Sequence, residues 1–105
     1  MTYQNKIINQ DEIKRDSGKS RVDLIEPEFI LGIGSVMEYG LKKYPQNAWK
    51  KIEDKHNRNY ASVLRHLLAW KSGEQNDTES GQSHLLHAAY NLMVLYYDDL
   101  HGEDK

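Results

Sequence analysis

Near the end of this chain, apolar residues recur every three or four positions, and this spacing restricts its fold more than any other feature. An α-helix repeats about every 3.6 residues, so residues at these intervals share one side of it. The stretch from about Gln82 to Leu100 is therefore predicted to be an amphipathic helix. Its apolar face consists of Leu85, Leu86, Ala89, Leu92, Met93, Tyr96 and Leu100.

Two earlier segments have the same periodicity. The first runs from Pro27 to about Tyr44, and proline suits the first helical turn because its missing N–H is not needed there. The second runs from about Tyr60 to Trp70, with Gly73 as a stop signal. The charged segment 50–59 between them is predicted to be a loop or short turn. The expected fold class is therefore all-α, a small helical domain of about three main helices.

The length of 105 residues predicts a single domain. We expect a polar N-terminal arm over residues 1–20, one helical domain over 21–101 and a frayed tail over 102–105. A helical chain of this size often completes its core by oligomerising, so a homo-oligomer is expected. Gly32 and Gly40 lie within the first predicted helix, where they would let another helix or a ligand approach closely.

Composition excludes several classes of function. The chain has no cysteine, which rules out disulfides, thiolate-bound zinc and thiol nucleophiles. A net charge of −2 gives no general attraction to nucleic acid or to an anionic membrane. The N-terminus lacks a signal-peptide pattern, and no apolar run approaches the ~20 residues of a membrane span. We therefore expect a soluble intracellular protein that binds neither a membrane nor nucleic acid directly.

Three polar residues share one face of the last predicted helix. His84, His87 and Asn91 follow at intervals of three and four. Two histidines one turn apart can contribute to a metal site if other side chains complete the set of ligands. The alternative is structural, with both histidines packed beside the apolar stripe and hydrogen-bonded to the preceding loop.

The loop before this helix is acidic. Glu74, Asp77 and Glu79 offer oxygen ligands of the kind that Mg²⁺ and Mn²⁺ bind together with substrate phosphates. The alternative is a solvated loop whose acids favour the positive end of the following helix.

Several other side chains are candidates for contacts with a phosphorylated ligand. Arginine offers a planar fork for phosphate, and aromatic rings can stack on a base, although any one of them can equally be a surface charge or a packing residue. The predicted substrate-binding residues are Lys19, Arg21, Tyr39, Lys43, Trp49, Arg58, Arg65 and Asn91.

Six segments in a fixed order resemble one known family. They are Arg-Val-Asp-Leu-Ile-x-Pro (21–27), Tyr-Gly-x-Lys-Lys-Tyr (39–44), Asn-x-Trp (47–49), Leu-Arg-His-Leu-Leu-Ala-Trp (64–70), Gly-Glu-x-x-Asp-x-Glu-Ser-Gly (73–81) and His-Leu-x-His-Ala-Ala-x-Asn (84–91). Together they are similar to the phage-type dATP/dGTP diphosphohydrolases, which include MazZ-like proteins. The resemblance covers roughly residues 17–97. It implies an all-α, oligomeric, Mg²⁺-dependent enzyme, broadly MazG-like, that converts dNTP and water into dNMP and pyrophosphate.

One departure from the MazG-like pattern affects the predicted site. Those enzymes carry Glu-x-x-Glu and Glu-x-x-Asp on successive helices. Here the first predicted helix has only Glu38 in its interior, and the last has His84-x-x-His87 at its beginning and Asp98 late, so the usual carboxylates are missing from the helices. We therefore predict that Mg²⁺ or Mn²⁺ is held by Glu38, Asp77, Glu79 and His84, and that His66 or His87 transfers protons.

The same departure leaves a second function open. A phage-derived helical oligomer in the cytoplasm of a bacterial host could sequester a nucleotide, including a defence-signalling nucleotide, without cleaving it.

Overall fold

The computed structural model describes residues 8–102, and every element longer than a single bridge in that range is helical. The elements are α1 (Gln10–Ile13), η2 (Val22–Leu24), α2 (Pro27–Gly40), η3 (Ala48–Lys51), α3 (Lys55–Lys71) and α4 (His84–His101), where η marks a 3₁₀ helix. The predicted all-α class is confirmed. Residues 1–7 of the predicted arm and 103–105 of the predicted tail lie outside the described range.

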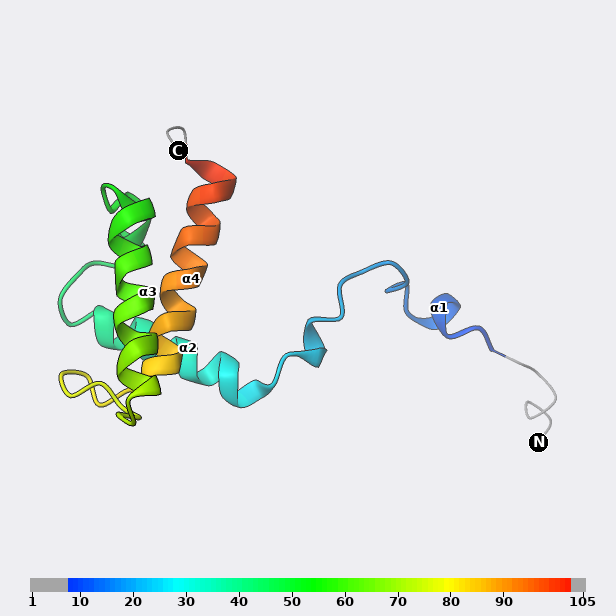
Figure 1. Ribbon diagram of the computed structural model, residues 1–105. Coiled ribbons are helices and arrows are strands. Elements are labelled where there is room, and N and C mark those ends of the chain that lie inside the picture. The colour runs from blue at the N-terminus through cyan, green and yellow to red at the C-terminus, as the bar shows by residue number, and fades with distance from the viewer. Residues whose placement is uncertain (1–7, 103–105) are drawn as a thin grey trace.

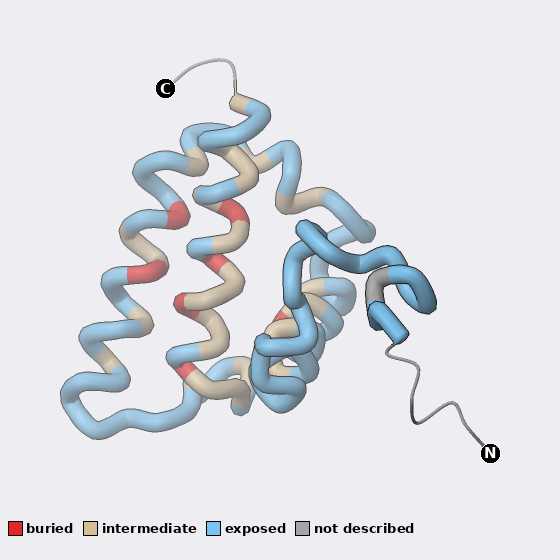
Figure 2. Tube along the Cα trace, turned by 90° about the vertical axis from the view of Figure 1, so that its right-hand side faces the viewer, coloured by how far each residue is buried: buried red, intermediate tan, exposed pale blue. Residues whose placement is uncertain are grey.

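A hairpin of two antiparallel helices forms the body of the molecule. α3 and α4 lie side by side, and α2 runs across α4 (Figure 1). Most of the buried positions lie along α3 and α4, and the buried apolar side chains of this hairpin are Val63, Ala88 and Val94 (Figure 2). The apolar face predicted as the core stripe of the last helix is wrong in part, because Leu85, Leu92, Tyr96 and Leu100 are exposed. Within residues 8–102, no helix is long and apolar enough to cross a membrane.

Polar contacts cross the hairpin at three levels, one above the other. Because the helices are antiparallel, residues early in α3 meet residues late in α4. The three contacts join Lys55 Nζ to Asp98 Oδ1 at 3.9 Å, Asn59 Nδ2 to Asn91 Oδ1 at 2.8 Å, and His66 Nδ1 to His84 Nδ1 at 2.9 Å. These contacts fix the register that brings His66 to the start of α4.

The predicted close approach at a glycine of α2 is confirmed at Gly32. A Cβ atom at this position would lie 2.5 Å from Cδ1 of Leu86, which is too close for any unshifted side chain. Gly34 and Gly40 have nothing within 4 Å of such an atom. Gly32 therefore lets α2 dock against α4, and Gly40 has no such role.

Two helix boundaries differ from the prediction. α2 ends at Gly40 rather than near residue 44, and the chain continues in turns. The predicted loop over 50–59 was wrong in its second half, because α3 already begins at Lys55. This charged first turn has no apolar period, but Lys55 and Asn59 contact α4 across the hairpin. Tertiary contacts therefore extend the helix beyond the segment that the pattern predicts.

The chain before α2 projects away from the hairpin (Figure 1). The radius of gyration of the Cα atoms is 19.9 Å, whereas a compact chain of this length would have about 13 Å. Val22 and Leu24 in this segment are 67% and 74% exposed.

Candidate functional site at the junction of α3 and α4

The connection between α3 and α4 is a folded loop with its own hydrogen bonds. Oδ2 of Asp77 accepts hydrogen bonds from the backbone N–H groups of Glu79 at 3.1 Å and Ser80 at 2.9 Å. The backbone N–H of Asp77 in turn donates to the carbonyl oxygen of Gln82 at 2.8 Å. Gly81 closes the turn with φ +73°, a conformation that favours glycine. This loop holds the Asp77 carboxylate near the start of α4.

His84 connects the loop to α3. The residue is buried, with 3% of its surface exposed, and its two ring nitrogens have different partners. Nε2 lies 2.6 Å from Oε1 of Glu74, and Nδ1 lies 2.9 Å from Nδ1 of His66. A carboxylate only accepts, so in the neutral ring Nε2 carries the proton and donates it to Glu74. Nδ1 of His84 then has a lone pair, and His66 donates to it.

His87 completes a group of three histidines. Its ring stacks on that of His66, with centroids 4.6 Å apart and planes 6° from parallel. Nε2 of His87 lies 2.6 Å from Oγ of Ser80, which also accepts a hydrogen bond from the backbone N–H of Gln82. The hydroxyl proton of Ser80 is therefore free to point at His87. The predicted hydrogen bonding between both α4 histidines and the preceding loop is thus present.

A cation could be held at this junction. One possible ligand atom each from His66, Asp77 and His84 lies within 4.8 Å of the other two. Two imidazole nitrogens and one carboxylate oxygen form a set of ligands that several divalent metals accept, Mn²⁺ included.

Burial controls the charge of these side chains. It lowers the pKa of His66 and the pKa of His87, and repulsion from the neighbouring histidines lowers both further. Burial alone would raise the pKa of Asp77, but hydrogen bonds from Ser80 and the two nearby imidazoles outweigh it, so the pKa is lowered. The junction thus combines a carboxylate whose ionised form is favoured with two histidines, His66 and His87, whose neutral form is favoured.

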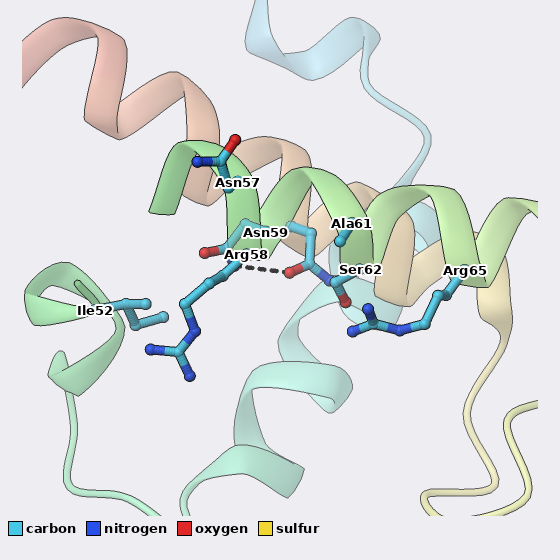
Figure 3. A pocket seen from close by; sticks show the side chains of 8 residues that line it. Ile52, Asn57, Arg58, Asn59, Ala61, Ser62 and Arg65 are labelled. Carbon is cyan, nitrogen blue, oxygen red and sulfur yellow. Dashed lines mark hydrogen bonds between the residues drawn. The ribbon is translucent and has the colours of Figure 1, made fainter. Parts of the chain in front are cut away.

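A second feature, a polar hollow of about 460 Å³, lies along α3, and its lining reaches from Ile52 to Arg65, the residue before His66. Arg58, Ser62 and Arg65 line it from one side of the helix, with Asn59 and Asn91 (Figure 3). Among the residues described, no carboxylate forms an ion pair with either arginine. Oδ1 of Asn59 is buried without a hydrogen-bond partner. Three predicted substrate-binding residues, Arg58, Arg65 and Asn91, are therefore brought together.

The other predicted residues lie elsewhere. Nζ of Lys43 is 2.6 Å from Oε2 of Glu79, and the Tyr39 hydroxyl reaches the backbone of the same residue at 3.5 Å. Glu79 therefore points towards Tyr39 of α2 and Lys43 of the turn that follows α2, and not into the histidine cluster. The remaining residues are exposed Glu38 on α2, exposed Lys19 on the arm, Arg21 paired with Asp23, and Trp49 packed edge-on against Tyr97.

Ser80 was not predicted as a site residue, and Glu74 was considered only as a possible metal ligand of the acidic loop, although both contact a junction histidine. Spacing alone cannot identify them, because an irregular loop has no repeat from which side-chain directions follow. The available signal was their presence in the Gly-Glu-x-x-Asp-x-Glu-Ser-Gly segment.

A sequence model of the family described as dATP/dGTP diphosphohydrolase, N-terminal, matches residues 9–105. The chain belongs to this family. The predicted resemblance is thus confirmed. A relative named dATP/dGTP diphosphohydrolase, from Salmonella phage PMBT28, is 34% identical over 85 residues. That match covers 81% of this chain but only 29% of the relative, so the chain corresponds to less than a third of that protein. No solved structure matches the chain.

Proposed function

We propose that this family member hydrolyses purine deoxynucleoside triphosphates to the monophosphate and pyrophosphate at the α3–α4 junction. The observation that carries the proposal is the convergence of His66, Asp77 and His84, together with a hollow on α3 whose lining includes Arg65, the residue before His66. Family membership and the name of the phage relative support the same reaction class. The nucleotide pool is cytoplasmic, so the proposal locates the chain in the cytoplasm of a phage-infected bacterium.

In the proposed reaction, water attacks the α-phosphorus. A new P–O bond forms, the bond from the α-phosphorus to the oxygen bridging to the β-phosphorus breaks, and pyrophosphate leaves. Arg65 would bind phosphate oxygens, because its guanidinium has no described carboxylate partner and its neighbour in sequence is His66. Arg58 lines the same hollow two helical turns away, about 10 Å along the axis, which suits the more distant part of the nucleotide.

The histidines suit proton transfer. Because His66 is proposed as a ligand of the cation, His87 is the proposed proton acceptor. A neutral imidazole can accept the proton that the attacking water loses, and the lowered pKa of His87 favours the neutral form. His87 has a defined partner in the hydroxyl of Ser80. A divalent cation held by His66, Asp77 and His84 would neutralise phosphate charge and acidify a bound water.

We also propose that the chain acts as a homo-oligomer. Within residues 8–102 the buried apolar side chains are only Val36, Val63, Ala88 and Val94, which form a small core. One stripe of α4 exposes large apolar residues, among them Leu92 at 54% and Tyr96 at 65%. Exposed apolar stripes of this size are typical of surfaces that a second copy covers.

A hydrolysis assay tests the proposed function. The chain is incubated with dATP or dGTP and with Mg²⁺ or Mn²⁺, and the products are separated by chromatography after denaturation. The proposal expects dAMP or dGMP together with pyrophosphate, and no turnover after chelation. Nucleotide that is bound but released chemically intact would instead support the sequestering function, and nucleotide that is neither bound nor cleaved would exclude both.

A further inference from the structure

The contact between His66 and His84 is unusual, because two ring nitrogens of the same type face each other. At 2.9 Å, Nδ1 of one ring and Nδ1 of the other share a single proton in the metal-free chain. Glu74 determines which ring supplies that proton, since it accepts the Nε2 proton of His84 at 2.6 Å. Nδ1 of His84 is thereby kept as a lone pair directed at His66.

The separation of the two nitrogens, though not the direction in which they face each other, also suits two ligands of one cation. Two nitrogens bound at right angles to a metal, with bonds of about 2.1 Å, lie about 3 Å apart. The observed separation of 2.9 Å is close to this value. Asp77 supplies an oxygen within 4.8 Å of both imidazoles, and Oδ2 of this carboxylate is already fixed by two backbone N–H groups.

The ligand atoms also indicate which class of metal ion the junction would bind. Mg²⁺ prefers a shell made entirely of oxygen and keeps most of its waters, whereas imidazole nitrogen suits transition-metal ions. Two of the three ligands at the junction are imidazoles. Of the other two acids in the loop, Glu79 pairs with Lys43 at 2.6 Å and Glu74 accepts the hydrogen bond of His84 Nε2, so neither is counted as a ligand.

We propose that the junction binds a transition-metal ion in preference to Mg²⁺, through His66, Asp77 and His84, and that Glu74 is a positioning residue for His84. The carboxylate of Glu74 orients the imidazole and increases the electron density on its metal-binding nitrogen. Outer partners of this kind contribute strongly to metal affinity, and their loss typically weakens binding 10- to 100-fold. Glu74 can do this from the edge of the site, where its side chain is 48% exposed.

The test measures metal binding without nucleotide, so it does not depend on the proposed hydrolysis. The metal-free chain is titrated with Co²⁺, and the visible d–d absorption of the bound ion reports on its ligands. We expect one ion per chain, with Mg²⁺ at millimolar concentration failing to displace it. Glu74→Gln should weaken Co²⁺ binding about 10- to 100-fold, because an amide still accepts the hydrogen bond but has no charge.

Glu79→Gln is the matched control, since it makes the same chemical change in the same loop at a residue that pairs with Lys43. It should leave Co²⁺ affinity within about twofold, an expectation based on the small energies of exposed pairs. Asp77→Asn should also weaken binding and should change the absorption spectrum. Circular dichroism confirms that each variant is folded, and the competition with Mg²⁺ needs only the wild-type chain.

The proposal is overturned if Mg²⁺ displaces Co²⁺ at comparable concentration, if no Co²⁺ binds, or if Glu74→Gln binds as tightly as the wild-type chain. Co²⁺ binding with the expected pattern in a chain that cleaves no nucleotide would support the metal site while removing the proposed function. Hydrolysis that proceeds with Mg²⁺ as the sole bound ion would support the proposed function and overturn the preference for a transition-metal ion.

Discussion

Replacing Asp77 with asparagine separates the chemistry of the junction from the folding of its loop. Oδ2 of Asp77 accepts two backbone hydrogen bonds, at 2.9 and 3.1 Å. Asparagine keeps one side-chain oxygen for this purpose but loses the negative charge. Hydrogen bonds to a charged acceptor contribute about 1 kcal/mol more than those to a neutral one, so the free energy of unfolding should fall by roughly that amount. For a chain of this size, this corresponds to a decrease in melting temperature of about 4–8 °C.

Activity should fall much further. If Asp77 is a metal ligand, its loss removes about 3 kcal/mol or more of transition-state stabilisation, and each 1.4 kcal/mol is about tenfold in rate. We therefore expect turnover of dATP by Asp77→Asn to fall at least 100-fold at a temperature where the variant is fully folded. Chromatographic measurement of dAMP formation, with circular dichroism on the same samples, makes the comparison.

Glu79→Gln is the control for this prediction. It breaks the 2.6 Å ion pair between Glu79 and Lys43. The side chains of Lys43 and Glu79 are 43% and 67% exposed, so both stability and turnover should change little. The reasoning is refuted if Asp77→Asn keeps wild-type turnover, or if Glu79→Gln loses as much activity as Asp77→Asn.

Three further predictions concern stability and assembly. Gly34→Ala should raise the free energy of unfolding by about 1 kcal/mol, because its Cβ would meet nothing within 4 Å. The free energy of unfolding of Gly32→Ala should be about 1–3 kcal/mol lower than that of Gly34→Ala, because its Cβ would meet Leu86 of α4. Denaturant titration of both variants measures this difference. The pKa values of His66 and His87 are lowered from 6.5 in the folded chain. In the presence of a chelator, the unfolded chain should therefore bind more protons than the folded chain at pH values below 6.5. Stability should therefore be complete above about pH 6.5 and should decline as pH falls towards the folded pKa values, and a melting temperature independent of pH between 7.5 and 5 would contradict this. Light scattering should give a mass above the 12.3 kDa of one chain, and Leu92→Glu on the exposed stripe of α4 should reduce it to that value.

The helices were predictable from the sequence because their apolar residues repeat at the helical period. The face shared by His84, His87 and Asn91 followed from the same period, and the side chains of His84 and Asn91 are both buried against α3. The early start of α3 was not predictable, since Lys55 and Asn59 are stabilised by partners on α4 that are distant in sequence.

The composition of the candidate site was only partly predictable. His66 joins His84 because the hairpin register aligns them, and no local pattern encodes that register. Glu79 and Asp77 are two residues apart in one loop, yet one pairs with Lys43 and the other faces the histidines. This difference depends on the turn that Asp77 and Gly81 form, which spacing does not reveal.

We propose above all that this chain directs water to the α-phosphorus of a purine deoxynucleoside triphosphate. The most direct test is hydrolysis of dATP in water labelled with ¹⁸O, followed by mass spectrometry of the products. We expect dAMP that carries one ¹⁸O atom and pyrophosphate that carries none. Label in pyrophosphate, formation of dADP and inorganic phosphate, or recovery of intact dATP would contradict it.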